Sequence, residues 1–405
     1  MLIMSFFNKT CMAFALTLGL AATAQAADID VTANITTSET WVNTNTYHLR
    51  DVIFVEPGAT LTIEAGTNVI GYTDIELTAW AGEQRDDSSA LIVARGGKIF
   101  ADGEKDNPII FTSDEDDFTN FQIRNADWGN LTILGDAIIS DGTACGGIQD
   151  GTCVDDIEGL VPGPLSKYGG TDDDHSIGRI QYVSLRYGGS VLSQASELNG
   201  FSIAGVGRES DIHHVEILNN IDDGIEIWGG TVGLKNVSIW NIGDDSFDLD
   251  EGFRGKAQFV LIVQGYSSLS GSQGSGWGDN IFEMDGGENP DGMKPWANPQ
   301  VFNFTVVGQN PSGTSGGDHL FAFRDNMRLQ AGNGVYVDIG DDLVNFDGGA
   351  FDTDMRDAFS TPFDQYDSTD VVLPIGDVQT MADFYSDSRT QTWSWIQNSI
   401  FANYE

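Results

Sequence analysis

The chain has 405 residues, a formal net charge of −42, and 49 glycines against only 10 prolines. So large a negative charge excludes nucleic acid and anionic membrane surfaces as direct partners, and it makes cations the natural counter-species. Short runs rich in Val, Ile, Thr and Asn between glycines indicate strands joined by turns, so the expected class is all-β.

Residues 1–26 have the features of a secretory signal peptide. Lys9 precedes an apolar run over residues 11–22, and the small-residue segment Ala24-Gln25-Ala26 follows. This pattern predicts cleavage after Ala26 and export to the periplasm, the cell surface or the extracellular medium. The apolar run is shorter than the roughly 20 residues of a membrane-spanning helix, and no later run reaches that length, so no transmembrane segment is expected.

Residues 51–353 alternate short apolar strands with turns bounded by Gly, Asn or Asp, a pattern typical of one β-solenoid. Strands are expected in ATLTIEAGTNVIGY, ALIVARGGKIFADG, NPIIFTSD, NLTILGDAIIS, FVLIVQGY, DNIFEMDGG, VFNFTVVGQ, HLFAFRDN and GVYVDIGDDLVNFDGG. Residues 27–50, with Trp41 and Tyr47, are expected to form an N-terminal cap. Residues 354–405 are expected to form a C-terminal cap or extension.

Two segments align without a gap at a period of 22 residues: HVEILNNIDDGIEIWGG from His214 and NVSIWNIGDDSFDLDEG from Asn236. In this alignment apolar positions fall on apolar positions, and Asn219 falls on Asn241 as expected for an amide ladder. One coil of that length cannot bury its apolar face alone, so neighbouring coils must stack about 4.8 Å apart. The predicted fold is therefore a right-handed parallel β-helix with coils of about 22 residues.

Three longer segments interrupt the coils, at residues 114–125, 141–174 and 267–279. Such loops either line a binding face or are tolerated surface insertions, and both interpretations stay open. The second segment contains Cys145 and Cys153, which are expected to form a disulfide in an exported protein. Free thiols are the alternative, and a zinc site is disfavoured because no histidine lies nearby in the sequence.

The densest group of charged residues is an acidic ladder on the two aligned coils. Its members are Asp222, Asp223, Glu226, Asp244, Asp245, Asp248, Asp250 and Glu251. In the predicted register like charges lie about 5 Å apart, and at an effective dielectric of about 20 each pair repels by roughly 3 kcal/mol. A cation, a shared proton or strong hydrogen bonding must offset this repulsion.

Bound Ca²⁺ is the preferred hypothesis for the ladder, because carboxylate and backbone oxygens in Asp- and Gly-rich turns suit this ion. The segment DDSFDLDEG is not an EF-hand loop, since it lacks the required Gly at the sixth position and Glu at the twelfth. The alternative is that these aspartates form side-chain-to-backbone turns and face water.

The same carboxylates permit an enzymatic interpretation, in which two of Asp223, Asp244 and Asp245 act as general acid and base on a glycosidic bond. The motifs IDDG and GDDS resemble the aspartate motifs of polygalacturonases, but the Gly-His-Gly and Arg-Ile-Lys motifs of those enzymes have no counterpart. A lyase would need a basic residue, for which Arg254 and Lys256 are the candidates. Their alternative role is to neutralise neighbouring carboxylates.

Other side chains near the ladder carry weaker signals. His213 and His214 are adjacent, so a regular strand points them to opposite faces and a metal pair is not expected. Trp228, Trp240 and Trp277 either stack on sugar rings or pack within the solenoid.

A series of motifs from Glu56 to Gly287 resembles the leptospiral surface lipoprotein family and its exported relatives in aquatic bacteria. In order, they are WGNLTILG, IEGL, KYGGTDDDHSIGRIQYVSLRYGG, ELNGFSIAGVG, DDGIEIWGGTV and GDDSFDLDEGFRGKAQF. The resemblance implies a β-helical protein of the periplasm or cell surface, often lipid-anchored, with no established catalytic activity. This chain departs from the lipoprotein members because no lipid-acceptor cysteine stands at its predicted cleavage site.

The preferred function is non-enzymatic: an exported, calcium-stabilised β-helix that binds a cell-surface component, an extracellular glycan or another extracellular ligand. The alternative is an extracellular polysaccharide lyase or glycoside hydrolase that acts on an acidic polysaccharide. The first predicts loss of thermal stability on chelation without turnover. The second predicts release of unsaturated uronates or of reducing ends.

Overall fold

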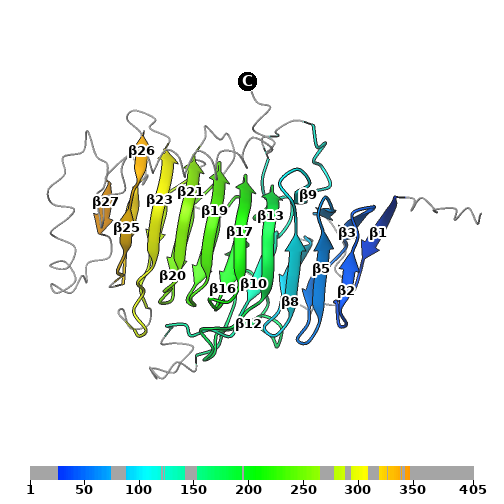
Figure 1. Cartoon of the computed structure of the whole chain (residues 1–405), viewed down its shortest axis with the longest axis horizontal. Coiled ribbons are helices and arrows are strands. Elements are labelled where there is room, and N and C mark those ends of the chain that lie inside the picture. Colours follow the sequence, from blue (N-terminus) through cyan, green and yellow to red (C-terminus); the bar gives the residue numbers. More distant parts are fainter. Residues whose placement is uncertain are drawn as a thin grey trace, which may run out of the picture.

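The computed structural model describes residues 26–73, 88–119, 122, 124–141, 153–193, 196–264, 278–287, 293–308, 319–325, 327–337, 339 and 343–346. These residues form a right-handed parallel β-helix, which Figure 1 shows from the side. The predicted fold class is confirmed. The expected signal peptide, Cys145, Trp277 and the expected C-terminal cap fall outside the described residues, apart from Ala26.

Two parallel sheets run along the solenoid. The larger has 14 strands: β1 (Ala27–Val31), β2 (Glu39–Trp41), β3 (Asn45–Leu49), β5 (Thr60–Glu64), β6 (Asn68–Gly71), β8 (Lys98–Asp102), β9 (Ile109–Ser113), β13 (Gly178–Arg186), β17 (Asp211–Leu218), β19 (Gly233–Trp240), β21 (Lys256–Val263), β23 (Gln300–Val307), β25 (Gln330–Gly332) and β26 (Val335–Val337). The smaller has 9 strands: β4 (Val52–Val55), β7 (Ala90–Val93), β10 (Leu131–Leu134), β16 (Phe201–Ala204), β18 (Ile225–Trp228), β20 (Phe247–Asp250), β22 (Phe282–Met284), β24 (Phe321–Phe323) and β27 (Val344–Phe346). Two antiparallel hairpins lie outside these sheets: β11 (Asp155–Asp156) with β12 (Lys167–Tyr168), and β14 (Val191–Ser193) with β15 (Ser196–Glu197).

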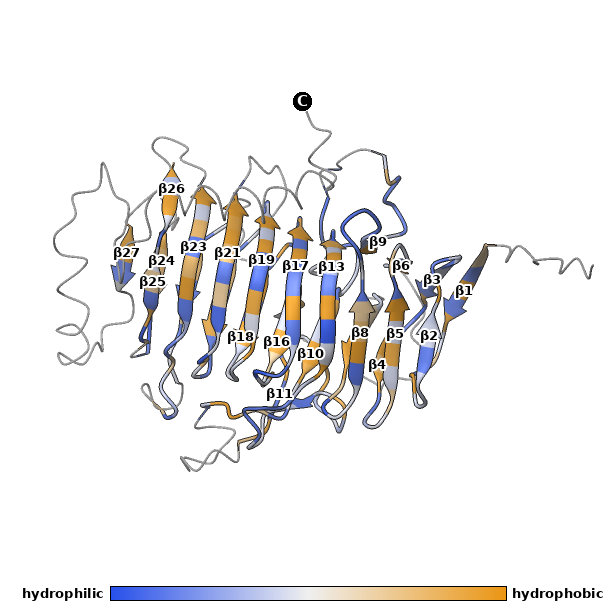
Figure 2. Ribbon diagram, in the orientation of Figure 1, coloured by the Kyte–Doolittle hydropathy of each residue, from blue (hydrophilic) through white to orange (hydrophobic). Residues whose placement is uncertain are grey.

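Alternating side chains explain why these short segments are strands. In β18 and β20, Ile225, Ile227, Phe247 and Leu249 point into the solenoid and are 0% exposed. Each such side chain stabilises the fold by about 1.5–3 kcal/mol, provided that coils above and below complete its burial. Figure 2 shows the resulting hydrophobic and hydrophilic bands along the strands.

The predicted 22-residue register is confirmed where the sequence repeat was found. Val215 in β17 lies opposite Val237 in β19. Asn241 donates its side-chain amide to Oδ1 of Asn219 at 3.1 Å across a separation of 22 residues, so the expected amide ladder is present. Stacked amides satisfy one another's hydrogen-bonding groups without bringing any charge into the ladder.

The long strands of the larger sheet bend at one residue in the left-handed conformation. The bend residues are Tyr182, His214, Asn236, Phe259 and Asn303, and their φ values lie between 48° and 59°. Few residues other than glycine and asparagine adopt this conformation readily, so each bend is held by the pairing on both sides of it. One strand thereby supplies two walls of a coil.

The bend at His214 also makes one sequence expectation wrong. His213 and His214 do not point to opposite faces, because His214 has a φ of 54° and leaves the regular strand geometry. Their Nδ1 atoms lie 2.7 Å apart. Burial lowers the pKa of both imidazoles, that of His214 to about 4, so the pair is accommodated as neutral rings.

Residues 27–50 contribute strands to the larger sheet at its N-terminal end. β1 pairs with β3 and is the edge strand. Trp41 and Tyr47 stack with ring centroids 4.6 Å apart and belong to the continuous core. Within the described part of the chain, no helix has the length and apolar character needed to cross a membrane.

Candidate functional site: a carboxylate column

The outward face of the smaller sheet carries stacked acidic side chains. Glu226, Asp248 and Glu283 alternate with the core residues of β18, β20 and β22 and so point outward. The register places Asp248 opposite both Glu226 and Glu283. The three carboxylates therefore stand on adjacent strands, about 4.8 Å apart. They are only 6%, 6% and 8% exposed.

The turns that precede these strands add a second line of oxygen atoms. The backbone N–H of Asp223 donates to Oδ1 of Asn199 at 3.1 Å, and that of Asp245 donates to Oδ1 of Asp223 at 2.9 Å. The N–H of Asn280 donates to Oδ1 of Asp245 at 2.5 Å. Each side chain thus holds the backbone of the next coil, which is the turn-forming role left open for these aspartates.

These side chains form what we call the acidic column. Its members are Asp222, Asp223, Glu226, Asp244, Asp245, Asp248, Asp279 and Glu283. Three overlapping groups within it bring one oxygen from each member within 4.8 Å of the others: Asp222 with Asp223 and Asp244, Asp223 with Glu226 and Asp248, and Asp244 with Asp245 and Asp279. At that separation two charges repel by about 3 kcal/mol at an effective dielectric of about 20.

Burial and mutual repulsion oppose the ionised state of the column. Burial first, and neighbouring carboxylates second, raise the pKa of Asp223, Glu226, Asp245 and Asp248 well above the ordinary values. Oδ1 of Asp248 is buried and has no hydrogen-bond partner among the described residues. A buried oxygen left in this way is costly, so the column is suited to take up either protons or a cation.

A single arginine stands at the C-terminal end of the column. Nη2 of Arg324, which follows β24, lies 2.6 Å from Oε1 of Glu283, and Nη1 lies 3.7 Å from Oδ2 of Asp285. Burial and then the charges of Asp250 and Glu283 raise the pKa of Asp285 to about 9, although Arg324 acts in the opposite direction. The arginine therefore offsets only part of the negative charge.

Four residues at this end were not predicted from the sequence, because the 22-residue period breaks after β21: Asp279, Glu283, Asp285 and Arg324. Asp248 and its partner Glu283 are 35 positions apart, since a loop intervenes. A signal was present in DNIFEMDGG, which repeats the acidic and apolar alternation of DDSFDLDEG. Aligning strands rather than whole coils would have found it.

A sequence model of the pectate-lyase-like β-helix domain matches residues 33–382. The chain belongs to this family. No curated protein and no solved structure matches the chain. The match covers nearly all of the described solenoid, including both sheets and the acidic column.

In this pectate-lyase-like β-helix, Arg254 and Lys256 lie away from the column. Arg254 forms an ion pair with Asp173 at 2.5 Å and donates to the carbonyl oxygen of Ile138 at 3.1 Å. Burial opposes ionisation of Asp173, but the hydrogen bonds and charge of Arg254 outweigh it and lower the pKa of that carboxyl. Lys256 begins β21 and is exposed. The structure thus brings neither residue to the aspartates beside which a catalytic role was considered.

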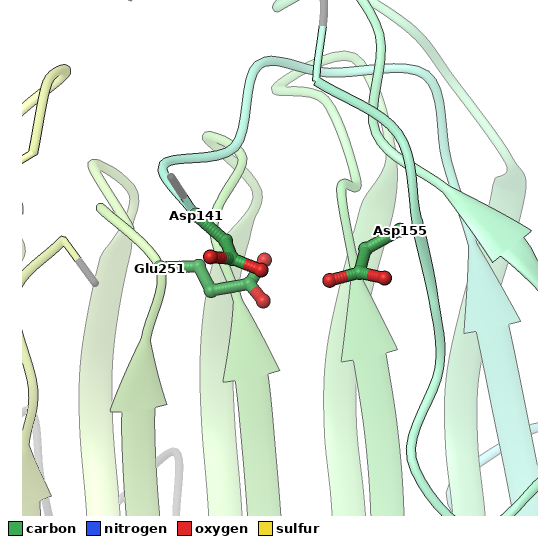
Figure 3. Close-up of side chains that lie close together, drawn as sticks. All are labelled: Asp141, Asp155 and Glu251. Atoms are coloured by element: carbon green, nitrogen blue, oxygen red, sulfur yellow. The ribbon is translucent and has the colours of Figure 1, made fainter. Parts of the chain in front are cut away.

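One ladder residue, Glu251, separates from the rest. Burial raises the pKa of Glu226 and Asp248, and Asp250 stays close enough for its charge to add to that rise. Asp250 ends β20, and Glu251 follows it in a turn with a φ of 47°. Glu251 meets Asp141 and Asp155 instead, as Figure 3 shows. The sequence offered no signal for this group, because its members come from segments about a hundred residues apart that only the fold brings together.

Two further predictions fall on the long insertion. Trp228 is 5% exposed and its ring centroid lies 6.4 Å from that of Tyr168, so it packs beneath the insertion, which is the second of the two roles considered. Cys153 is 2% exposed within the same apolar cluster. Because Cys145 lies outside the described residues, the disulfide stays a prediction.

Proposed function

We propose that the protein is an exported β-helix whose acidic column binds calcium, and that it holds a surface partner or an extracellular ligand without chemical turnover. One observation carries this proposal: three carboxylates of adjacent strands, each at least nine-tenths buried, stand in register with an unpartnered oxygen on Asp248. Neutral residues in these positions would pack without this repulsion. The arrangement is therefore best explained by a bound cation.

The donor set favours calcium among the common cations. All of the side-chain donors are carboxylate oxygens, which suit hard cations, and no thiol or imidazole stands among them. Calcium accepts six to eight oxygens in a flexible arrangement, whereas magnesium requires a near-ideal octahedron (about 2.1 Å). The spacing of the strands fixes the positions of the column carboxylates, and such a set of ligands suits the flexible coordination of calcium better than the octahedron of magnesium.

The expected setting of the protein agrees with this choice. The predicted signal peptide would deliver residues 27–405 to a compartment in which calcium is abundant and a Cys145–Cys153 disulfide can form. The motif series from Glu56 to Gly287 further supports a place among the exported relatives of the leptospiral surface lipoproteins. Among such exported proteins, a solenoid stabilised by cations would act by binding a partner or ligand on its surface.

Thermal melting with and without a chelator tests the calcium proposal. We expect chelation to lower the melting temperature of the mature protein by about 5 °C or more, and calcium to restore it better than magnesium. Asp248→Asn should abolish most of this response, while Glu209→Gln, at an exposed position, should retain it. A melting temperature that chelation leaves unchanged would contradict the proposal.

A second function, cleavage of an acidic polysaccharide, is favoured by Arg324 beside Glu283 and Asp285 and by the family match. Burial disfavours the charged guanidinium, but Glu283 and Asp285 outweigh it and raise the pKa of Arg324. An arginine held protonated suits binding of a uronate carboxylate better than proton abstraction. Incubation with polyuronides separates the outcomes, since a lyase generates unsaturated uronate absorbance, a hydrolase releases reducing ends, and a binding protein does neither.

A further inference from the structure

The insertion after β10 covers the outward face of the smaller sheet near its middle. Ile139, Leu160 and Tyr168 from the insertion pack with Leu134 and Trp228 of the sheet in one buried cluster. In Figure 1 the hairpin formed by β11 and β12 runs along the lower edge of the solenoid. The described part of the insertion, residues 153–174, is thus packed against the sheet as a cover.

Three carboxylates meet where this cover joins the coils. Asp141 follows Ser140, whose backbone N–H donates to the carbonyl oxygen of Glu251 at 2.9 Å. Asp155 begins β11, and Glu251 follows β20. One oxygen from each side chain lies within 4.8 Å of the others. Figure 3 shows the three side chains converging, two from the insertion and one from the coil.

Glu251 supplies an independent sign of a missing ligand. Its side chain is buried, with 6% of the residue exposed, and its Oε1 accepts a hydrogen bond from the Tyr168 hydroxyl at 2.7 Å. Its Oε2 is buried and has no hydrogen-bond partner among the described residues. The tyrosine therefore holds the carboxylate by one oxygen, and the other oxygen is left without a hydrogen-bond partner among the described residues.

The neighbouring basic residues have other partners. Lys167 pairs with Asp156, and Arg254 pairs with Asp173. Within the described ranges no lysine or arginine forms an ion pair with Asp155 or Glu251. The protein thus neutralises Asp156 and Asp173 with its own cations, whereas among the described residues it places no lysine or arginine against Asp155 or Glu251.

We propose that Asp141, Asp155 and Glu251 bind one divalent cation of the calcium class, separate from the acidic column, which fastens the insertion to the coils. The ligands are three carboxylate oxygens from two distant parts of the chain, so the ion closes a long loop. Water or backbone oxygens complete its coordination. The site does not depend on the proposed function, because it shares no residue with the acidic column.

A shared proton is the competing arrangement. Burial, and then the hydrogen bond between its side chain and Asp141, raise the pKa of Asp155 to about 6. A proton on this pair would hold the two acids together below that pH but would be lost above it. Counting bound ions separates the two arrangements, because a proton on Asp155, or on Glu251 whose pKa burial also raises, adds no bound calcium. Cation affinity rises with pH, so the count is made at about pH 7.5.

Counting bound calcium by native mass spectrometry at about pH 7.5 tests the proposal. We expect Asp155→Asn and Glu251→Gln each to bind one ion fewer than the unsubstituted protein. Asp156→Asn is the matched control, because it removes an adjacent acid that Lys167 already neutralises, and it should bind the full number. If Asp155→Asn and Glu251→Gln both keep the full number of ions, the site does not exist.

Hydrogen exchange of the unsubstituted protein provides a second measurement that needs no buried substitution. Calcium should slow exchange in peptides covering residues 153–168 by about tenfold, and Asp155→Asn should remove this protection. Equal protection in Asp155→Asn would overturn the proposal. In the ion count, Asp248→Asn reports separately on the acidic column. If only Asp248→Asn loses an ion, the column binds calcium and the site at Asp141, Asp155 and Glu251 does not. If only Asp155→Asn loses an ion, the site at the insertion exists and the column does not bind calcium.

Discussion

The outward face of the smaller sheet has two halves built on the same strands. One half carries apolar side chains and the other carries acidic ones. Along one outward column the residues change from Ala204 to Trp228 and then to Asp250 on successive strands. The first two lie beneath the insertion in an apolar cluster. The acidic column runs beside this line, from Glu226 on the same strand as Trp228 to Asp248 and Glu283 on the next two strands. The same β-helix backbone therefore accepts apolar or acidic side chains on its outer face. The identity of single outward residues decides whether that face packs against another segment of the chain or attracts cations.

The largest expected effect is on the covered half. Trp228→Ala should destabilise the protein by about 3–5 kcal/mol, because it leaves a cavity between the sheet and Tyr168 that the solenoid cannot close. Urea denaturation measures this. Trp296→Ala removes an indole that is 39% exposed and should cost clearly less. Equal losses would mean that the insertion does not depend on packing against the sheet.

Substitution in the acidic half should raise the free energy of unfolding when no calcium is present, whereas substitution in the covered half lowers it. In chelator, Asp248→Asn should stabilise the protein by about 1–2 kcal/mol, because a neutral amide replaces a buried acid whose ionisation is opposed by burial, Glu283 and Glu226. In calcium the same substitution should destabilise, since a ligand is lost. Paired urea titrations check this change of sign. Destabilisation under both conditions would indicate that Asp248 serves packing alone.

The pH dependence of the calcium-free protein sharpens the contrast further. Burial raises the pKa values of Asp223, Glu226, Asp245 and Asp248 in the folded state. Outside the column, the pKa values of Asp155 and Asp285 rise from 3.8 to about 6 and about 9. The native state then binds more protons than the unfolded state, so stability falls as pH rises from about 4 toward 9. Melting curves in chelator should show this fall. Calcium should flatten it, and a rise with pH in chelator would contradict the account.

The smallest effect is expected at the neutral ladder beside the acids. Asn241→Gly keeps the freedom to adopt a φ of 53° but removes the amide bond to Asn219, and should cost about 1 kcal/mol. The cost should be the same with calcium and with chelator. A calcium-dependent cost would show that the amides and the acidic column are coupled.

The sequence predicted the fold and six of the eight residues of the acidic column for the same reason. Where coils follow one another without a loop, Asp223 and Asp245 lie 22 positions apart, and the repeat aligns them directly. Glu283 and Arg324 follow coils that loops interrupt, so a fixed period of 22 residues does not align them with the earlier coils. The bend at His214 was missed because pattern arguments assume regular strands.

The group of Asp141, Asp155 and Glu251 marks the limit of such reasoning. The Tyr168 hydroxyl that orients Glu251 lies 83 positions before it in the chain. No local pattern records that contact, because it depends on how an irregular insertion folds back over the sheet. Only the three-dimensional arrangement brings these acids together.

We propose that a cation, rather than protons, balances the negative charge of the acidic column. A crystal structure of the mature protein grown at neutral pH with calcium, and again with a lanthanide for its anomalous signal, tests this most directly. We expect an anomalous peak about 2.3–2.6 Å from a carboxylate oxygen of Asp248, at a position that Glu226 or Asp223 also contacts. Short carboxyl-to-carboxylate hydrogen bonds at these residues, with no such peak, would contradict it.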